Sequence, residues 1–411
     1  MEILFIHGNY PAQFRGLAED LGSQNIHDVR FLTARKDPEK YPITGVTVEK
    51  YIDVDKCQSG SNPIQAIVNE QVERAQIIQK EIGRLAKGGF TPRLIIFHGG
   101  NGLGMLIKKI IPDATIIGYF EWYFTNRCSE IVLGQSNLSG YNFIHARNIS
   151  TENELVSCDA AIVPTEWQAS QFPKKLRPLL TTIFDGIDLD FFKPGGAEIF
   201  KNQLLIQGEA GQITVNSEDL LLTYATRGME PIRGFPQFMR ALPELLERLP
   251  NLKVLIGGRD RSAYGPSCPT HNGSWKEMIL DELPMLKDHP RIIYTGLMNY
   301  QNYRMMLQRT NLHCYFTEPF VTSWSLFEAV ACGAPLLCNA SPATSEAVNL
   351  RAANILKNIE EVYSERGIEA ATSILRKQSL RQQGLNKDFS INKAKEKWAN
   401  LINNLIQAKH S

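Results

Sequence analysis

The chain of 411 residues has no excess of charge of one sign, because 44 lysine and arginine residues balance 43 aspartate and glutamate residues. A dedicated nucleic-acid-binding protein normally carries a basic excess, so this balance argues against that class. Hydrophobic residues make up 43% of the chain and charged residues 21%, which excludes a wholly disordered or fibrous protein. The length is sufficient for about two or three domains with separate cores.

The sequence also lacks a long hydrophobic run and any regular cysteine spacing. No stretch approaches the roughly 18 apolar residues that cross a bilayer. The N-terminus, MEILFIHGN, has neither the basic start nor the longer apolar core of a signal peptide. The seven cysteines include no C-x-x-C pair, which indicates neither a disulfide framework nor a zinc site: Cys57, Cys128, Cys158, Cys268, Cys314, Cys332 and Cys338. We therefore expect a cytoplasmic protein with at most a peripheral membrane contact.

Short apolar runs alternate with helical patterns along both halves of the chain. In the first half, runs typical of buried parallel strands occupy 3–6, 94–97, 115–119 and 160–163, and apolar residues recur at helical spacing over 64–85. In the second half, strands are predicted at 220–224, 254–256, 292–294, 313–316 and from 335, with helices at 235–249, 302–308 and 326–331. The alternation predicts two Rossmann-like, doubly wound α/β domains that face each other across a cleft.

The domain boundaries are expected where glycine, proline and polar residues gather. The stretch from Lys193 to about Asp219 has this composition and is interpreted as a linker. The predicted N-terminal domain covers residues 1–195 and the C-terminal domain covers 196–390. Residues 391–411 form a terminal amphipathic helix.

Two loops of the second half carry groups that suit a phosphate. Ser323 and Ser325 lie in the first turn of a predicted helix, where exposed N–H groups and the helix dipole attract an anion. Arg227 and Arg233 flank a glycine-containing turn, and guanidinium groups bind phosphate bidentately. Glu328, on the same helix as the serines, would accept from sugar hydroxyls. From the residues alone, a capped helix with a solvated Glu328 is equally open. A surface loop with solvated arginines is favoured when the arginine loop is taken by itself.

Taken in order, these stretches resemble the retaining family 4 of the GT-B nucleotide-sugar glycosyltransferases. In that family an Arg and a following Lys neutralise the donor diphosphate, and Arg227 and Arg233 fill those places. The run EAVACGAP at 328–335 matches the family's second Glu and the residues after it. By resemblance, Glu328 would hold the donor ribose. Phe320 stands where the family has a first Glu that contacts the donor sugar, and Glu318 comes two residues too early.

The N-terminal half resembles a particular subgroup of this family through HGNYPAQF at 7–14, YFEWY at 119–123, PTEWQ at 164–168 and DGID at 185–188. By resemblance, His98 lies near the transferred sugar; the alternative is a histidine that caps the next helix. His7 is a weaker candidate. Gly8 would let the chain pass close to the diphosphate, and Gly186 suits a positive φ. The glycines at 99, 100, 102 and 104 do not form a nicotinamide-binding fingerprint.

The resemblance implies a retaining glycosyltransferase whose donor is a UDP-sugar or, second, a GDP-sugar. It also implies that the terminal helix at 391–411 crosses back to the N-terminal domain. His98, Arg227 and Arg233 would be catalytic. The C-terminal domain would bind the nucleotide with Ser323, Trp324, Ser325 and Glu328, and with backbone near Leu297 at the base, while the N-terminal domain holds the acceptor. Glu121, Trp122 and Tyr123 either line the acceptor pocket or pack in the core.

The acceptor itself is not readable, so a secondary metabolite and a cell-surface glycan or lipid intermediate stay open. No essential metal is expected, and the D-x-D patterns at 53–55 and 188–190 are interpreted as chance matches. Two rival functions remain. A non-catalytic nucleotide-sugar-binding or partner-binding protein is favoured by Phe320, and a sugar-nucleotide epimerase shares the two-domain build.

Overall fold

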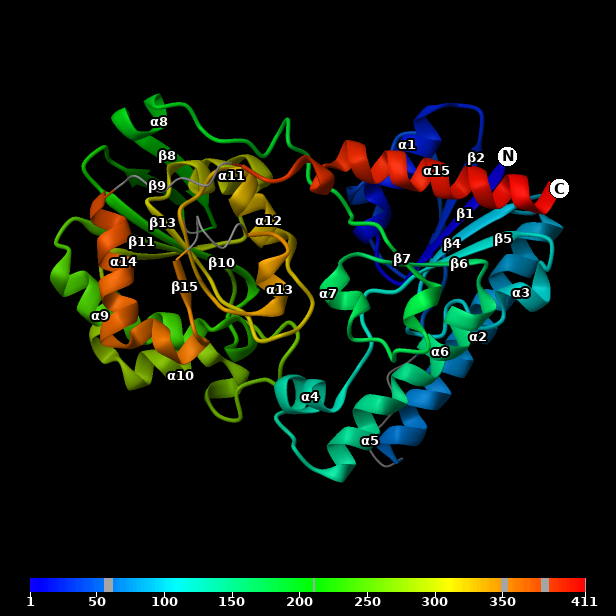
Figure 1. Cartoon of the computed structure of the whole chain (residues 1–411), viewed down its shortest axis with the longest axis horizontal. Helices are drawn as coiled ribbons and strands as arrows, with labels where there is room; N and C mark the ends of the chain where they lie inside the picture. Colours follow the sequence, from blue (N-terminus) through cyan, green and yellow to red (C-terminus); the bar gives the residue numbers. More distant parts are fainter. Residues whose placement is uncertain (55–61, 210, 349–353, 378–383, 411) are drawn as a thin grey trace. The chain divides into compact units, whose positions relative to one another are not determined.

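The computed structural model describes residues 1–54, 62–209, 211–348, 354–377 and 384–410. The chain divides into two compact units, whose elements are labelled in Figure 1. Unit 1 comprises Met1–Glu130, Gln135–Gly186 and Asp388–Ser411, and unit 2 comprises Ile131–Gly134 and Ile187–Lys387. Each unit is built on its own parallel sheet, which confirms the predicted pair of α/β domains.

Unit 1 contains a seven-stranded parallel sheet with the order β3-β2-β1-β4-β5-β6-β7. Alternate residues of the first strand enter different cores: Ile3 packs with Trp398, and Leu4 packs with Ile78. Both faces of the sheet are therefore covered, as continuous apolar runs predict. The strands are β1 (Glu2–His7), β2 (Asp28–Thr33), β3 (Val46–Lys50), β4 (Leu94–His98), β5 (Thr115–Tyr119), β6 (Ala160–Val163) and β7 (Leu180–Thr182).

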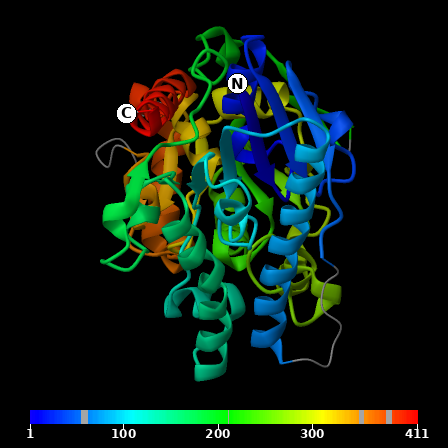
Figure 2. The ribbon, with the colours of Figure 1, turned by 90° about the vertical axis from the view of Figure 1, so that its right-hand side faces the viewer.

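The helices of unit 1 cover this sheet. They are α1 (Arg15–Ser23), α2 (Pro63–Lys87), α3 (Ile107–Ile110), α4 (Asn126–Cys128), α5 (Leu138–Ala146), α6 (Asn148–Ser157), α7 (Glu166–Ala169) and α15 (Ile391–His410). Helix α2 lies beside α5, as Figure 2 shows, and α15 packs on α1. Gly186 has a φ of +90°, and a Cβ there would lie 2.5 Å from the Cα of Ile391. Glycine at this turn therefore lets α15 approach the unit closely.

Unit 2 contains a six-stranded parallel sheet with the order β12-β11-β10-β13-β14-β15. Its strands are β10 (Leu220–Gly228), β11 (Leu252–Arg259), β12 (Ile292–Gly296), β13 (Leu312–Tyr315), β14 (Leu336–Asn339) and β15 (Asn354–Leu356). Its helices are α8 (Glu198–Lys201), α9 (Phe235–Arg248), α10 (Trp275–Glu282), α11 (Tyr300–Arg309), α12 (Trp324–Ala331), α13 (Pro342–Ser345) and α14 (Glu365–Lys377). In the described parts of both units, no helix combines the length and hydropathy that a bilayer span requires.

The segment expected to be a linker is instead partly folded. It contains α8 and an antiparallel hairpin of β8 (Leu204–Gly208) and β9 (Gly211–Val215). The backbone N–H of Glu209 donates to the Thr295 carbonyl over 2.8 Å, which fixes the hairpin to the end of β12. The linker interpretation was wrong because glycines at 208 and 211 serve a hairpin turn here.

Candidate active site

Two histidines meet at the carboxyl edge of the sheet in unit 1. His7 ends β1 and His98 ends β4, and the register pairs Ile6 with Phe97 in these neighbouring strands. The two imidazole rings therefore lie side by side, with their centroids 4.4 Å apart. His98 is a strand residue, so the alternative in which it caps the next helix is wrong.

Polar groups from the loops after β1 and β5 surround this histidine pair. The Asn9 N–H donates to Nδ1 of His7 over 2.8 Å, and Nε2 of His7 lies 3.1 Å from Oε1 of Gln13. The Gln13 amide donates to Oε1 of Glu121 over 3.1 Å, and Oε2 of Glu121 lies 3.6 Å from Nε2 of His98. Burial, and then the neighbouring His98, hold the pKa of His7 well below its ordinary value, so His7 is neutral.

The glycine-containing loop after β4 is held by a buried carboxylate that the sequence analysis missed. Glu154 is fully buried in α6 and accepts from the Gly100 N–H over 2.5 Å and the Gly104 N–H over 2.8 Å. Burial raises the pKa of Glu154 to about 7, although these N–H groups oppose the shift. A Cβ at Gly104 would lie 2.2 Å from the Phe97 ring, so packing requires glycine there.

The aromatic residues after β5 are mostly packed inside unit 1. Trp122 is 7% exposed and donates to the Cys128 sulfur over 3.3 Å. Tyr123 is 8% exposed and donates to Glu152 over 2.5 Å. Only Glu121 of this set keeps a partly exposed side chain. Trp122 and Tyr123 are therefore core residues, and of these three only Glu121 presents a side chain at the surface.

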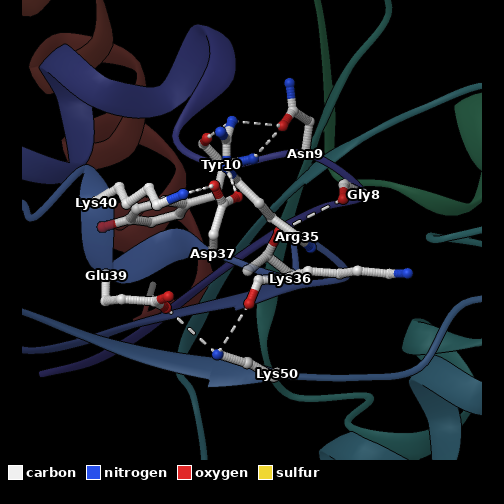
Figure 3. Close-up of polar contacts among 10 residues, drawn as sticks. Gly8, Asn9, Tyr10, Arg35, Lys36, Asp37, Glu39, Lys40 and Lys50 are labelled. Atoms are coloured by element: carbon white, nitrogen blue, oxygen red, sulfur yellow. Dashed lines mark hydrogen bonds and ion pairs between the residues drawn. The ribbon is translucent and has the colours of Figure 1, made fainter.

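Gly8 lies in the loop after β1, within the polar network of Figure 3. The Thr33 hydroxyl donates to the Gly8 carbonyl over 3.5 Å, and Arg35 holds the same loop through Asn9 over 3.2 Å. A Cβ at Gly8 would meet only the Tyr51 hydroxyl, at an ordinary 3.7 Å. The packing of unit 1 therefore does not itself require glycine at this position.

In unit 2, Arg233 is buried with only neutral partners. It is 4% exposed, and its guanidinium donates to the Thr317 hydroxyl over 2.6 Å and the Val321 carbonyl over 3.1 Å. No carboxylate among the described residues forms an ion pair with it. A φ of +67° at Gly234 turns the chain into α9 directly after Arg233, which fixes the residue at the sheet edge. A buried cation without an acidic partner is suited to binding an anion.

Tyr264, which the sequence analysis also missed, connects the two arginines. The exposed Arg227 donates to the Tyr264 hydroxyl over 3.4 Å, and the Arg233 guanidinium lies 5.2 Å from the centre of the Tyr264 ring. Phe320 packs against the same ring at 5.6 Å and is 6% exposed. Phe320, which stands where a Glu was expected, thus packs with Tyr264 beside both arginines.

The loop that carries Tyr264 is anchored by Glu230, a fully buried carboxylate. Glu230 accepts from the N–H groups of Ala263, Tyr264 and Gly265 over 3.0, 3.1 and 2.7 Å. No sequence motif marks this role, because the loop follows more than 30 residues later in the chain.

Glu230→Gln is expected to lower the free energy of unfolding by about 1–3 kcal/mol, because an amide nitrogen would then face a backbone donor. Urea unfolding measures this loss, and Glu247→Gln, an exposed change in α9, is the control. Equal stability of the two variants would show that the anchor is unimportant.

The start of α12 is less open than the sequence suggested. Ser323 is the N-cap, and its hydroxyl accepts from the Ser325 N–H over 3.3 Å. The Ser323 N–H itself donates to the Tyr315 hydroxyl over 3.3 Å. The expectation of free N–H groups at Ser323 and Ser325 must be corrected, because the Tyr315 hydroxyl and the Ser323 cap already accept from them. Trp324 is 36% exposed in the same turn.

Both serines nevertheless line a small pocket of unit 2, together with Arg233. Its other lining residues are Tyr224, Ala225, Thr226, Cys314, Tyr315 and Phe316. The carboxyl ends of β10 and β13 thus bring a guanidinium and two hydroxyls to one pocket.

Glu328 is buried rather than solvated. It is 6% exposed, and burial raises its pKa to about 7, while the neighbouring Tyr303 hydroxyl opposes the shift. The solvated alternative is therefore wrong. Leu297 lies after β12 and is 47% exposed.

The D-x-D patterns have local structural roles where the structure describes them. Asp188 accepts from the N–H groups of Asp190 and Phe191, each over 3.0 Å. Asp53 pairs with Arg74 over 2.7 Å, while Asp55, like Cys57, lies outside the described residues. Within the described ranges, no group of three His, Cys, Asp or Glu side chains could hold a metal.

Solved structures share this fold over nearly the whole chain. Sucrose-phosphate synthase from Thermosynechococcus elongatus has a TM-score of 0.63 at 15% identity, covering 99% of this chain and 100% of that one. Anabaena HepE in complex with UDP and glucose has a TM-score of 0.60 at 12% identity, covering 98% and 100%. A putative UDP-N-acetylglucosamine 2-epimerase from Listeria monocytogenes has a TM-score of 0.52 at 12% identity, covering 99% and 97%.

The sequence comparisons are narrower. No curated protein matches the chain. The model of the glycosyl transferase family 4 group matches residues 25–192. The expected resemblance is thereby confirmed: residues 25–192 match the glycosyl transferase family 4 group, and the chain has the two-domain fold of the GT-B glycosyltransferases.

Proposed function

We propose that the protein is a retaining, metal-independent glycosyltransferase that moves a sugar from a nucleotide-sugar donor to an acceptor. The observation that carries the proposal is Arg233, a buried guanidinium with neutral partners in a pocket shared with Ser323 and Ser325. Arg227 donates to the hydroxyl of Tyr264, the residue whose ring lies beside Arg233, and adds a second positive charge. A diphosphate bound here would be neutralised by these groups without a metal.

The donor nucleotide is proposed to occupy unit 2. Glu328 would accept from the ribose hydroxyls, the backbone near Leu297 would meet the base, and Trp324 would lie beside the phosphates. UDP is the first candidate and GDP the second. Gly8, where the unit's own packing leaves room, would let the loop after β1 approach the diphosphate.

The acceptor is proposed to meet unit 1 at the loop of Glu121, Trp122 and Tyr123, with His98 positioning the transferred sugar. In the reaction of the resembling family, the acceptor oxygen bonds to the anomeric carbon on the face that the phosphate leaves. The bond from that carbon to the phosphate oxygen breaks, and the acceptor proton passes to the departing phosphate. The two arginines stabilise the charge that develops there.

The second candidate is a binding protein without transfer. Phe320 favours it, because an apolar ring replaces the carboxylate that the resembling family directs at the donor sugar. The buried Arg233 and Glu328 are compatible with both functions, so turnover decides between them.

A titration of UDP, GDP and ADP, each with and without magnesium, tests the donor site. We expect one nucleotide to bind with a dissociation constant in the range of about 1–100 µM without metal. Arg227→Ala should weaken it by about 10-fold, since one charge-assisted hydrogen bond is lost. Absence of binding, or binding indifferent to Arg227, would refute the donor site. Donor cleavage with a panel of acceptors then separates transfer from binding alone.

A further inference from the structure

A chain of polar contacts runs from His7 through Gln13 and Glu121 to His98. It determines which atoms of each side chain donate a hydrogen bond and which accept one. It begins at a backbone donor whose role is fixed: the Asn9 N–H points at Nδ1 of His7 over 2.8 Å. Nδ1 of His7 must therefore accept, and a neutral imidazole then carries its proton on Nε2. Burial keeps the pKa of His7 well below its ordinary value, which supports the neutral form.

The His7 proton orients the Gln13 amide. Nε2 of His7 donates to Oε1 of Gln13 over 3.1 Å, so the Gln13 NH₂ group faces the other way. That NH₂ group donates to Oε1 of Glu121 over 3.1 Å. The main chain of Glu121 is held by Gln168, whose side-chain amide donates to the Glu121 backbone carbonyl over 2.6 Å.

The remaining carboxylate oxygen faces His98. Oε2 of Glu121 lies 3.6 Å from Nε2 of His98, and this nitrogen is buried without a hydrogen-bond partner. A lone pair on Nε2 would be repelled by the carboxylate, whereas an Nε2–H is attracted to it. We infer that Glu121, supported by Gln13 and His7, is a positioning residue that holds His98 as the Nε2–H tautomer, leaving Nδ1 as a hydrogen-bond acceptor.

Only the consequence of this inference for the choice of sugar rests on the proposed function. If His98 contacts the transferred sugar, its Nδ1 accepts a hydrogen bond from a sugar hydroxyl. The same nitrogen has no proton to donate to the carboxylate of a uronic acid. The charge of Glu121 also disfavours an anionic group at this place. The site would therefore select a hydroxylated sugar over a uronic acid.

The test is the tautomer itself, which needs no substrate. In Glu121→Gln, the NH₂ group of Gln13 still needs an acceptor, so the new side chain must turn its amide oxygen toward Gln13. The NH₂ group of residue 121 then faces His98. Nε2 of His98 then has to accept, and the proton moves to Nδ1. Long-range ¹H–¹⁵N NMR of histidine-labelled protein distinguishes the two nitrogens. We expect a pyrrole-type Nε2 for His98 in the wild type and a pyrrole-type Nδ1 in the variant.

Internal controls keep the result interpretable. His7 should remain the Nε2–H tautomer in Glu121→Gln, because the Asn9 N–H is unchanged, and this signal also reports that the loop is folded. Glu121→Asp, which keeps the carboxylate, should retain the wild-type pattern for His98. Glu19→Gln, an exposed change in α1, should alter neither histidine. An unchanged His98 pattern in Glu121→Gln, or an Nδ1–H tautomer in the wild type, would overturn the inference whether or not a nucleotide binds.

Discussion

Arg233→Met should weaken nucleotide binding by about 100-fold, with little loss of stability. The loss of binding follows from removing charge-assisted hydrogen bonds to the diphosphate, worth about 1.5–3 kcal/mol. Stability should persist because the wild type buries this guanidinium against neutral acceptors, Thr317 and Val321. Burying a cation in this way carries a desolvation cost that methionine removes.

The measurement pairs a UDP titration with thermal unfolding of the nucleotide-free protein. Arg376→Met, an exposed change in α14, is the matched control and should bind UDP as the wild type does. Together, a large fall in melting temperature and unchanged UDP affinity in Arg233→Met would mean that Arg233 is a structural residue.

Glu154→Gln should change the pH dependence of stability by about 3 kcal/mol. The pKa of Glu154 rises from 4.5 to about 7 on folding, mainly because the carboxylate is fully buried. Between these values the folded protein binds more protons than the unfolded chain. The contribution of Glu154 to the free energy of unfolding of the wild type must therefore fall as pH rises from 4.5 to 7. Glutamine does not titrate, so this contribution disappears in the variant.

Urea unfolding at intervals from pH 4.5 to 8 gives the difference between wild type and Glu154→Gln directly. Because His7 and other titrating groups are common to both proteins, their contributions cancel. We expect the loss of unfolding free energy caused by Glu154→Gln to become smaller as pH rises. Asn153→Gln, an exposed and non-titrating change on the same helix, should show no such trend. A pH-independent difference for Glu154→Gln would mean that folding does not raise the pKa of Glu154.

Among the strands, the sequence predicted those that are apolar along their whole length, and it missed β3, which is not. Strands β1, β4 and β5 are buried on both faces, so their runs were distinct. Strand β3 has exposed and half-buried residues, and its pattern does not stand out. The hairpin of β8 and β9 was taken for a linker because its turn glycines resemble linker composition.

The candidate site divides in the same way. His98, Arg233 and Glu328 belong to motifs and were therefore singled out as candidates from the sequence. Glu154 and Glu230 were not, because each holds a loop distant in the chain, and only the fold brings carboxylate and loop together. Glu154 is 54 residues from the Gly100 N–H that it accepts from. Burial of an isolated Glu on a helix leaves no signal in one sequence.

A crystal structure of the protein with UDP tests the central claim most directly. We expect the diphosphate in unit 2, with phosphate oxygens within hydrogen-bonding distance of the Arg233 guanidinium and close to Ser323, and the ribose against Glu328. A diphosphate bound away from Arg233, or held only by groups of unit 1, would contradict it.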